Sequence, residues 1–419
     1  MRRDWQLAIV GCACTAAVPA ARACDLHLSL APELAATSAA GSVSAPGLNL
    51  PAGAGGGLNV PAYNSLPGAH AAVYLDFDGD FTPSWHGYTP GQTPAYSTDG
   101  DATSFSAQEL TNIHEIWSRV SEKFSPFNLN VTTVDPGDRD DRKTLQVVIG
   151  GDGRNGGGDY WLGFRAGGVA WAGGFYTNAS NTVFVFPGNL NNGDPKRVGE
   201  ASSHESGHGF GLAHQSLYGP QGQFIDEYNP GDAQRAPVMG RSYDAARGLW
   251  WRGPTITANS TQDDLLDISS PFTNGFGYRA DDHGNTIGSA TPLAPTGSAV
   301  SSFGVIAQTT DADYFRFDTL AGDVSFTLDV APFGAMLDAS LALYDSTGLL
   351  LANSATSSLG ESLSRTLPGG TYALAVTSAG SYGDIGQYFL TGTIVAVPEP
   401  GAIALLTLGC VALGRRRAH

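Results

Sequence analysis

Cysteine is nearly absent from this sequence of 419 residues. Its four cysteines lie near the ends of the chain, at Cys12, Cys14, Cys24 and Cys410. Disulfide bonds within the middle of the chain are therefore excluded. Burial of apolar side chains, together with any bound metal, must stabilise the fold.

Charged residues are also scarce, at 15% of the chain, and basic ones most of all. The 22 basic and 39 acidic residues leave a formal net charge of −17. This balance argues against nucleic acid as a partner, because such an interface needs clustered positive charge. Glycine is instead plentiful, with 55 residues, and apolar residues make up 42%. The composition favours a strand-rich and loop-rich globular protein, and the length favours two domains with tails.

Residues 1–23 match a secretory signal peptide. Arg2 and Arg3 precede an apolar run of small residues, and Ala21-Arg22-Ala23 supplies a cleavage site of the Ala-x-Ala type. A membrane anchor is the weaker interpretation, because the run is shorter than the ~20 residues that span a bilayer. Residues 24–70 are rich in alanine, glycine, proline and serine without a sustained period, which predicts a linker or a short pro-segment.

The polar run from His204 to His214 is the strongest chemical signal. It reads His-Glu-Ser-Gly-His-Gly-Phe-Gly-Leu-Ala-His. On a helix, His204 and His208 lie on one face, so that both imidazoles can bind one metal ion. His214 reaches the same ion only if the helix ends first, and Gly209 and Gly211 permit such a break. Three imidazoles leave the fourth position of a tetrahedral zinc open to water, as expected of a catalytic site.

Glu205 is the candidate general base. It lies beside the metal-binding face of the helix and is placed to accept a proton from water at the metal. The alternative is a glycine-rich amphipathic helix whose histidines only pack or form hydrogen bonds. Three histidines, a glutamate and a glycine at fixed spacing favour the metal site.

This run resembles the extended zinc-binding motif of the metzincins, a family of zinc endopeptidases. The resemblance covers residues 71–270 and implies an α+β domain with a mixed sheet and an active-site helix. It also implies an antiparallel edge strand beside the cleft, at Gly168 to Phe175, for which an ordinary surface hairpin is the alternative. An exposed edge strand can pair with an extended peptide substrate.

The resemblance also implies a turn with a methionine below the zinc ligands. Ala236-Pro237-Val238-Met239-Gly240 matches it, and Met239 would pack rather than bind the metal. In some metzincins a tyrosine two residues after this methionine helps to stabilise the transition state. Tyr243 follows Met239 by four residues instead, and is a second candidate catalytic residue, with simple packing as the alternative.

Periodicity and capping signals predict the elements of this domain. Ser106-x-x-Glu109 is a capping box before a long amphipathic helix, and Asp194-Pro195 opens the helix that carries His204. Ser260 is expected to cap a last helix over Thr261 to Ile268. Strands are expected at residues 72–77, 129–134, 145–149, 168–175 and 182–186.

Residues 271–280 are expected to link two domains, and residues 281–395 to form an all-β sandwich. Short alternating runs predict its strands, at 302–306, 313–317, 324–330, 340–344, 371–376 and 388–394. The segments 281–286, 311–315 and 370–372 resemble the bacterial pre-peptidase C-terminal domain, an accessory module of secreted proteases. In relatives some of these acidic positions bind calcium, and solvated turn carboxylates are the alternative.

Residues 397–419 resemble a PEP-CTERM sorting signal. Val397-Pro398-Glu399-Pro400 precedes an apolar run from Ala402 to Leu413, and Arg415-Arg416-Arg417 follows it. The resemblance implies a transient anchor in the inner membrane and cleavage by a membrane sorting protease. The enzyme would then be secreted from, or attached to the surface of, a Gram-negative bacterium. A plain C-terminal anchor is the alternative.

Together these patterns predict a secreted zinc-dependent endopeptidase that acts on protein or peptide substrates. One alternative is a surface adhesion or matrix-binding protein on an inactive metallopeptidase scaffold. Loss of a ligand or of the glutamate would signal it, and neither is lost. The other alternative is a zinc hydrolase that acts on a non-peptide ester or amide.

Overall fold

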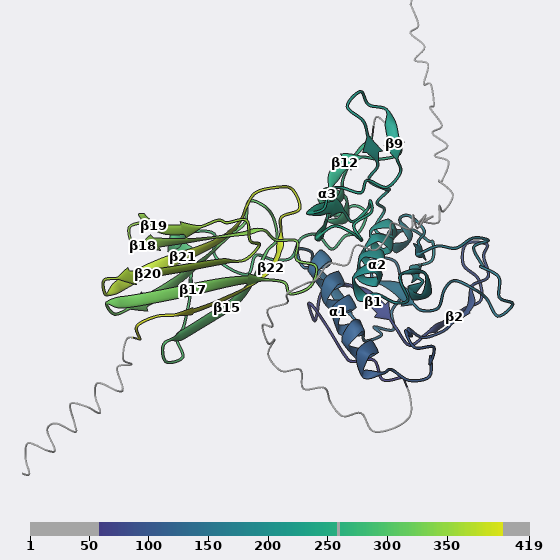
Figure 1. Cartoon of the computed structure of the whole chain (residues 1–419), viewed down its shortest axis with the longest axis horizontal. Helices are drawn as coiled ribbons and strands as arrows, with labels where there is room; N and C mark the ends of the chain where they lie inside the picture. Colours follow the sequence, from purple (N-terminus) through teal and green to yellow (C-terminus); the bar gives the residue numbers. More distant parts are fainter. Residues whose placement is uncertain (1–57, 258–259, 397–419) are drawn as a thin grey trace, which may run out of the picture.

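The structure is a computed structural model that describes residues 58–257 and 260–396. The expected signal peptide, residues 24–57 of the expected linker or pro-segment, and the expected sorting segment lie outside the described residues. The chain is mixed and strand-rich. Figure 1 shows two bodies side by side, one with helices packed on a sheet and one made of strands.

A five-stranded sheet organises the first body. Its order is β4-β1-β5-β7-β6, in which the first four strands are parallel and β6 is an antiparallel edge strand. Strands β1 and β5 are buried along their whole length, as continuous apolar runs predict for central parallel strands. The strands are β1 (Ala71–Asp76), β4 (Leu129–Thr132), β5 (Thr144–Ile149), β6 (Gly168–Val169) and β7 (Thr182–Val185).

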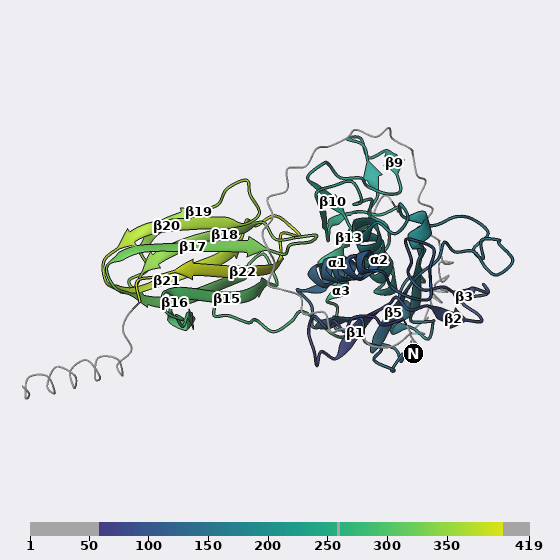
Figure 2. The same cartoon turned by 60° about the horizontal axis from the view of Figure 1, so that its bottom comes forward.

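Two helices, α1 (Ala107–Phe124) and α2 (Pro195–Gly209), lie against each other and against this sheet (Figure 2). Both predicted starts are confirmed. The Ser106 hydroxyl accepts from the backbone N–H of Glu109, and the Glu109 carboxylate accepts from that of Ser106. The Asp194 carboxylate accepts from the N–H of Arg197 at 2.9 Å. These caps satisfy N–H groups that a helix leaves without partners.

Short elements fill the rest of the first body. Figure 1 shows β9 projecting away from the main sheet. The elements are β2 (Asp80–Thr82), β3 (Gly91–Thr93), η1 (Gly174–Tyr176), η2 (Pro187–Asn189), β8 (Leu217–Tyr218), β9 (Phe224–Asp226), β10 (Arg235–Pro237), β11 (Arg247–Leu249), β12 (Arg252–Pro254), β13 (Thr261–Asp263) and α3 (Asp264–Ile268).

Among the elements whose boundaries differ from those expected are one strand and one helix of the first body. The strand expected over residues 168–175 is β6, which ends at Val169, because a turn at Gly173 with φ of +74° leads into η1. The helix expected over residues 261–268 is α3, which begins at Asp264 with Asp263 as its cap. Residues 261–263 pair with β12 as a strand and so cannot join the helix.

The second body consists of two sheets, of order β14-β16-β21-β18-β19 and β15-β22-β17-β20. Alternate residues of their strands are buried, as in two sheets that share one apolar core. A short turn, η3 (Ile287–Ser289), precedes them. The strands are β14 (Thr291–Pro292), β15 (Ala299–Ile306), β16 (Ala312–Thr319), β17 (Gly322–Val330), β18 (Ala339–Asp345), β19 (Leu350–Ser354), β20 (Glu361–Leu367), β21 (Gly370–Ser378) and β22 (Gly386–Thr393).

The two bodies share a buried junction. The segment expected to link them packs against the first body, where the ring of Tyr278 stacks on Phe127 at 5.5 Å and Phe276 is buried. The carboxylate of Glu122, at the end of α1, accepts from the N–H groups of Met336 and Gln387 in the second body. Helix α1 is therefore in direct contact with both bodies.

Candidate metal centre

Three histidine side chains converge at the C-terminal end of α2. His204 and His208 lie on the helix and His214 follows it, and their candidate ligand atoms all lie within 4.8 Å of one another. The side chains are 5, 7 and 6% exposed. The Nε2 atoms of His208 and His214 are 3.0 Å apart. The structure thus brings together the three residues that the sequence motif selects.

The other ring nitrogen of each histidine has a hydrogen-bond acceptor. Nδ1 of His204 lies 2.7 Å from the carbonyl oxygen of Val238, and Nδ1 of His208 lies 2.7 Å from that of Leu212. Nδ1 of His214 lies 2.8 Å from a carboxylate oxygen of Glu227. An acceptor at Nδ1 places the ring proton there and leaves the lone pair on Nε2.

In this tautomer, the short contact between Nε2 of His208 and Nε2 of His214 brings two lone pairs together. Two lone pairs 3.0 Å apart repel each other, whereas a cation between them would attract both. Two nitrogens bound to a tetrahedral zinc at ~2.0–2.1 Å lie roughly 3.3 Å apart. The donor set and its spacing therefore fit zinc.

The electrostatic environment keeps two of the imidazoles neutral. Burial, and then the nearby His214, lowers the pKa of His204 to about 3. The same causes lower the pKa of His208 well below its ordinary value. Neutral imidazole is the form that binds metal ions, so the site is prepared for a cation at neutral pH.

The helix ends as the motif requires, and one glycine supplies the break. Gly211 has φ of +99°, its N–H donates to the carbonyl of His208, and the N–H of Leu212 donates to that of Gly207. This is the Schellman arrangement, which reverses the chain after a helix. Gly209, expected to share in the break, is instead the last helical residue.

Gly209 serves close packing. A Cβ at this position would lie 2.7 Å from Cδ2 of Leu145 on β5, so a larger residue would have to displace either the Leu145 side chain or the helix.

Met239 lies directly beneath the helix. It is fully buried, and a Cβ on Gly207 would come within 2.4 Å of its sulfur atom. The preceding residue, Val238, provides the carbonyl that orients His204. Met239 thus packs against the helix that carries His204 and His208.

Glu205 is buried beside the edge strand. It is 1% exposed, and a Cβ on Gly168 would lie 2.6 Å from its Oε1 atom. Strand β6 therefore passes directly against the carboxylate that is the candidate general base. Only glycine leaves room for that carboxylate at position 168.

Two tyrosines, Tyr228 and Tyr243, have different surroundings. The ring of Tyr228 lies 4.3 Å from that of His214 and 6.3 Å from that of His204. The ring of Tyr243, the sequence candidate, lies 5.7 Å from the guanidinium carbon of Arg197. Tyr228 and Glu227 are site residues that the sequence analysis missed. They lie beyond the β8–β9 hairpin, and no motif spacing connects them to His214.

A second group of possible ligands lies in the second body. Carboxylate oxygens of Asp281, Asp311 and Asp313 lie within 4.8 Å of one another. Burial, and then the nearby acidic groups, raises the pKa of Asp313 to about 8, although Tyr388 donates a hydrogen bond to it. Oxygen ligands are those that calcium prefers.

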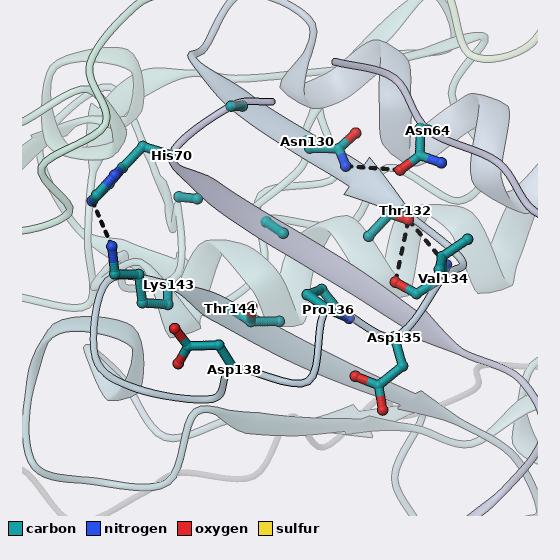
Figure 3. A pocket seen from close by; sticks show the side chains of 13 residues that line it. Asn64, His70, Asn130, Thr132, Val134, Asp135, Pro136, Asp138, Lys143 and Thr144 are labelled. Carbon is teal, nitrogen blue, oxygen red and sulfur yellow. Dashed lines mark hydrogen bonds between the residues drawn. The ribbon is translucent and has the colours of Figure 1, made fainter. Parts of the chain in front are cut away.

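A surface hollow of about 300 Å³ lies at the other side of the main sheet and involves none of these residues (Figure 3). Four of its polar side chains form two pairs with one another. Nζ of Lys143 lies 3.2 Å from Nε2 of His70, and the amide of Asn130 donates to that of Asn64 at 2.9 Å. We therefore place the candidate functional site at the histidines.

No family model and no curated protein matches the sequence. Among solved structures, the chain is similar to the pre-peptidase C-terminal domain of a collagenase from Bacillus anthracis, with 15% identity and a TM-score of 0.21, over 25% of this chain and 94% of that one. It is also similar to PliG, a periplasmic inhibitor of g-type lysozyme from Aeromonas hydrophila, with 14% identity and a TM-score of 0.21, over 25% and 95% of the chains.

A third similar structure is the Yersinia pseudotuberculosis-derived mitogen, with 15% identity and a TM-score of 0.20, over 25% of this chain and 92% of that one. Each of these three similarities covers 25% of this chain. Within residues 58–257 and 260–396, no helix combines the length and the apolar character needed to cross a bilayer.

Proposed function

We propose that this chain is a secreted zinc-dependent endopeptidase of metzincin type. The observation that carries the proposal is the convergence of three imidazoles whose Nδ1 atoms are all held by acceptors. A buried carboxylate, Glu205, and an edge strand lie beside them. These are the parts that peptide hydrolysis needs: a cation site, a base and a surface that holds an extended chain.

His204, His208 and His214 would hold the zinc. Bound zinc supplies Lewis acidity, which makes water more acidic and polarises a carbonyl group. Glu205 accepts the proton that the attacking water loses and later donates it to the leaving amine. Both proton transfers are thus assigned to one side chain, the carboxylate of Glu205.

The edge strand β6 would bind the substrate. Its backbone lies against Glu205, so a peptide that adds to this edge by backbone hydrogen bonds would lie close to the candidate base. Backbone hydrogen bonds recognise an extended peptide whatever its side chains are. An ester or amide without such a backbone lacks these contacts, which favours a peptide substrate.

A tyrosine would assist the oxyanion that forms at the carbonyl. Tyr228 lies against His214, so we expect Tyr228→Phe to lower kcat more than Tyr243→Phe does. A larger loss of kcat in Tyr243→Phe would assign the role to Tyr243, and equal losses would assign it to neither tyrosine alone.

The remaining parts of the proposal concern location and accessory sites. The second body would be an accessory module of the pre-peptidase C-terminal type, with calcium at Asp281, Asp311 and Asp313. The chain would be exported, held briefly in the inner membrane and cut by a membrane sorting protease. It would then act at the surface of, or outside, a Gram-negative bacterium.

The direct test is casein digestion by the full chain, with and without a zinc chelator. We expect digestion that the chelator abolishes and zinc restores. Glu205→Gln should retain zinc and lose nearly all activity, because the amide cannot accept the proton. Zinc binding without any digestion would favour an adhesion protein on an inactive scaffold. Substantial digestion by the Glu205→Gln variant would contradict the assigned base.

A further inference from the structure

The ring of the third histidine, His214, is held by a different kind of acceptor from the other two. His204 and His208 lie on α2, which fixes their backbones, and backbone carbonyls accept from their Nδ1 atoms. His214 lies after the helix, in a segment without regular structure. A carboxylate accepts from its Nδ1 atom, that of Glu227 at 2.8 Å.

The backbone around His214 is held by other residues. The side chain of Gln262 accepts from the N–H of Ala213 and donates to its carbonyl, both at 2.8 Å. The N–H of Gln215 donates to the carbonyl of Met239 at 2.8 Å. These contacts fix the main chain on both sides of His214, but rotation about its side-chain bonds needs a contact to the ring itself.

The loop that carries Glu227 is closed onto the same segment. The Ser216 hydroxyl donates to the carbonyl of Glu227 at 3.0 Å, and the N–H of Asn229 donates to the carbonyl of Gln215 at 2.8 Å. Both contacts join the two ends of the β8–β9 hairpin, where the chain enters β8 and leaves β9. Glu227 is thus held beside His214 by the base of the hairpin.

We infer that Glu227 is a positioning residue. It holds the ring of His214 toward the metal site and makes Nε2 of His214 a stronger ligand. A carboxylate that accepts from the remote nitrogen of an imidazole increases electron density at the other nitrogen and fixes the tautomer. It also places a carboxylate close to the three imidazole ligands. This inference rests on the proposed zinc centre, but not on peptide hydrolysis.

The test is the zinc dissociation constant of the full chain, measured by competition with a chromophoric chelator. Loss of such a partner typically weakens metal affinity about 10–100-fold, and we expect Glu227→Ala to fall in this range. Glu227→Gln keeps the shape and an acceptor oxygen but removes the charge, so its affinity should be intermediate. The order of the two variants separates charge from geometry.

Asp226→Asn is the matched control. Asp226 is the neighbouring carboxylate of the same hairpin and accepts from the N–H of Tyr228 at 3.0 Å. Its variant loses one charge at nearly the same place and should bind zinc within about twofold of the parent chain, because affinity depends on the ligand contact that it leaves intact.

Three outcomes decide the inference. Affinity that falls in the order parent, Gln, Ala, with the control unchanged, supports it. Equal losses in Asp226→Asn and Glu227→Ala overturn it, since hairpin stability or net charge would then be the cause. An unchanged affinity in Glu227→Ala also overturns it. A chain that binds zinc in this order but digests no peptide would refute the peptidase and leave Glu227 in its role.

Discussion

The ammonium group of Lys123 lies 3.4 Å from a carboxylate oxygen of Glu200 and donates to the carbonyl of Gly334 at 2.8 Å. Lys123 lies in the last turn of α1, Glu200 lies on α2 one turn before His204, and Gly334 belongs to the second body. The two charged side chains are 0 and 2% exposed. One buried ion pair therefore joins α2, which carries His204 and His208, to α1, and the same ammonium group also contacts the second body.

Removal of this ammonium group should destabilise the whole chain. Lys123→Ala leaves Glu200 buried without its cation, for which a loss of about 3 kcal/mol in the free energy of unfolding is typical. The control is Glu115→Gln, which breaks the more exposed pair with Arg119 on the same helix and should cost under about 0.5 kcal/mol. Denaturant unfolding of the full chain measures both, and equal losses would mean that the buried pair has no special weight.

A methyl group on the edge strand should impair catalysis. Gly168→Ala places a Cβ 2.6 Å from Oε1 of Glu205, so the carboxylate or the strand must move. Displacement of a catalytic group by about 1 Å can cost on the order of 100-fold in rate. We expect kcat to fall at least about tenfold, while zinc content stays the same.

Gly156→Ala is the control for that variant. A Cβ at Gly156 meets no atom within 4 Å, so its activity should equal that of the parent chain. A Gly168→Ala enzyme with full kcat would show that β6 does not constrain the base.

Stability should decline as the pH rises through the range in which Asp76 titrates. Burial, and then the nearby Asp78, raises the pKa of Asp76 from 3.8 to about 8. The folded chain therefore binds this proton more tightly than the unfolded chain does. The resulting stabilisation is complete below about pH 4 and is lost as the pH approaches 8.

Asp76→Asn removes this titration and should flatten the pH dependence of the free energy of unfolding between pH 4 and 8. Its amide can still accept from the Gln146 side chain, which lies 2.6 Å from the Asp76 carboxylate. Asp138→Asn, an exposed carboxylate, serves as the control. An unchanged slope in Asp76→Asn would assign the pH dependence to other groups.

Calcium should stabilise the second body through Asp313. We expect added calcium to raise the Tm of the full chain, because a cation bound only by the folded state shifts the unfolding equilibrium. Asp313→Asn should abolish that increase. Asp318→Asn, an exposed carboxylate on the same strand β16, should keep it. A Tm that does not respond to calcium would exclude calcium binding at these carboxylates.

Local signals were sufficient for much of the fold. The caps at Ser106 and Asp194 act within one helical turn, so the sequence predicts both helix starts. The spacing of His204, His208 and His214 is local in the same way. The predicted start of α3 was wrong because residues 261–263 pair with β12, and such pairing depends on residues outside the helix itself.

The missing part of the site depends on contacts across a hairpin. Glu227 reaches His214 only after β8 and β9 have paired, and no periodicity records that closure. Likewise, Glu122 and Lys123 resemble surface charges of an amphipathic helix. They are buried because the second body packs against the end of α1, and a pattern within one helix cannot show its partner.

The central claim is that three imidazoles bind one zinc ion and leave a position open. X-ray absorption at the zinc edge of the full chain tests it most directly. The account predicts one zinc per chain with three nitrogen neighbours at ~2.0–2.1 Å and one oxygen neighbour. A chain that takes up no zinc from a stoichiometric solution, or a zinc bound by fewer than three imidazoles, would contradict it.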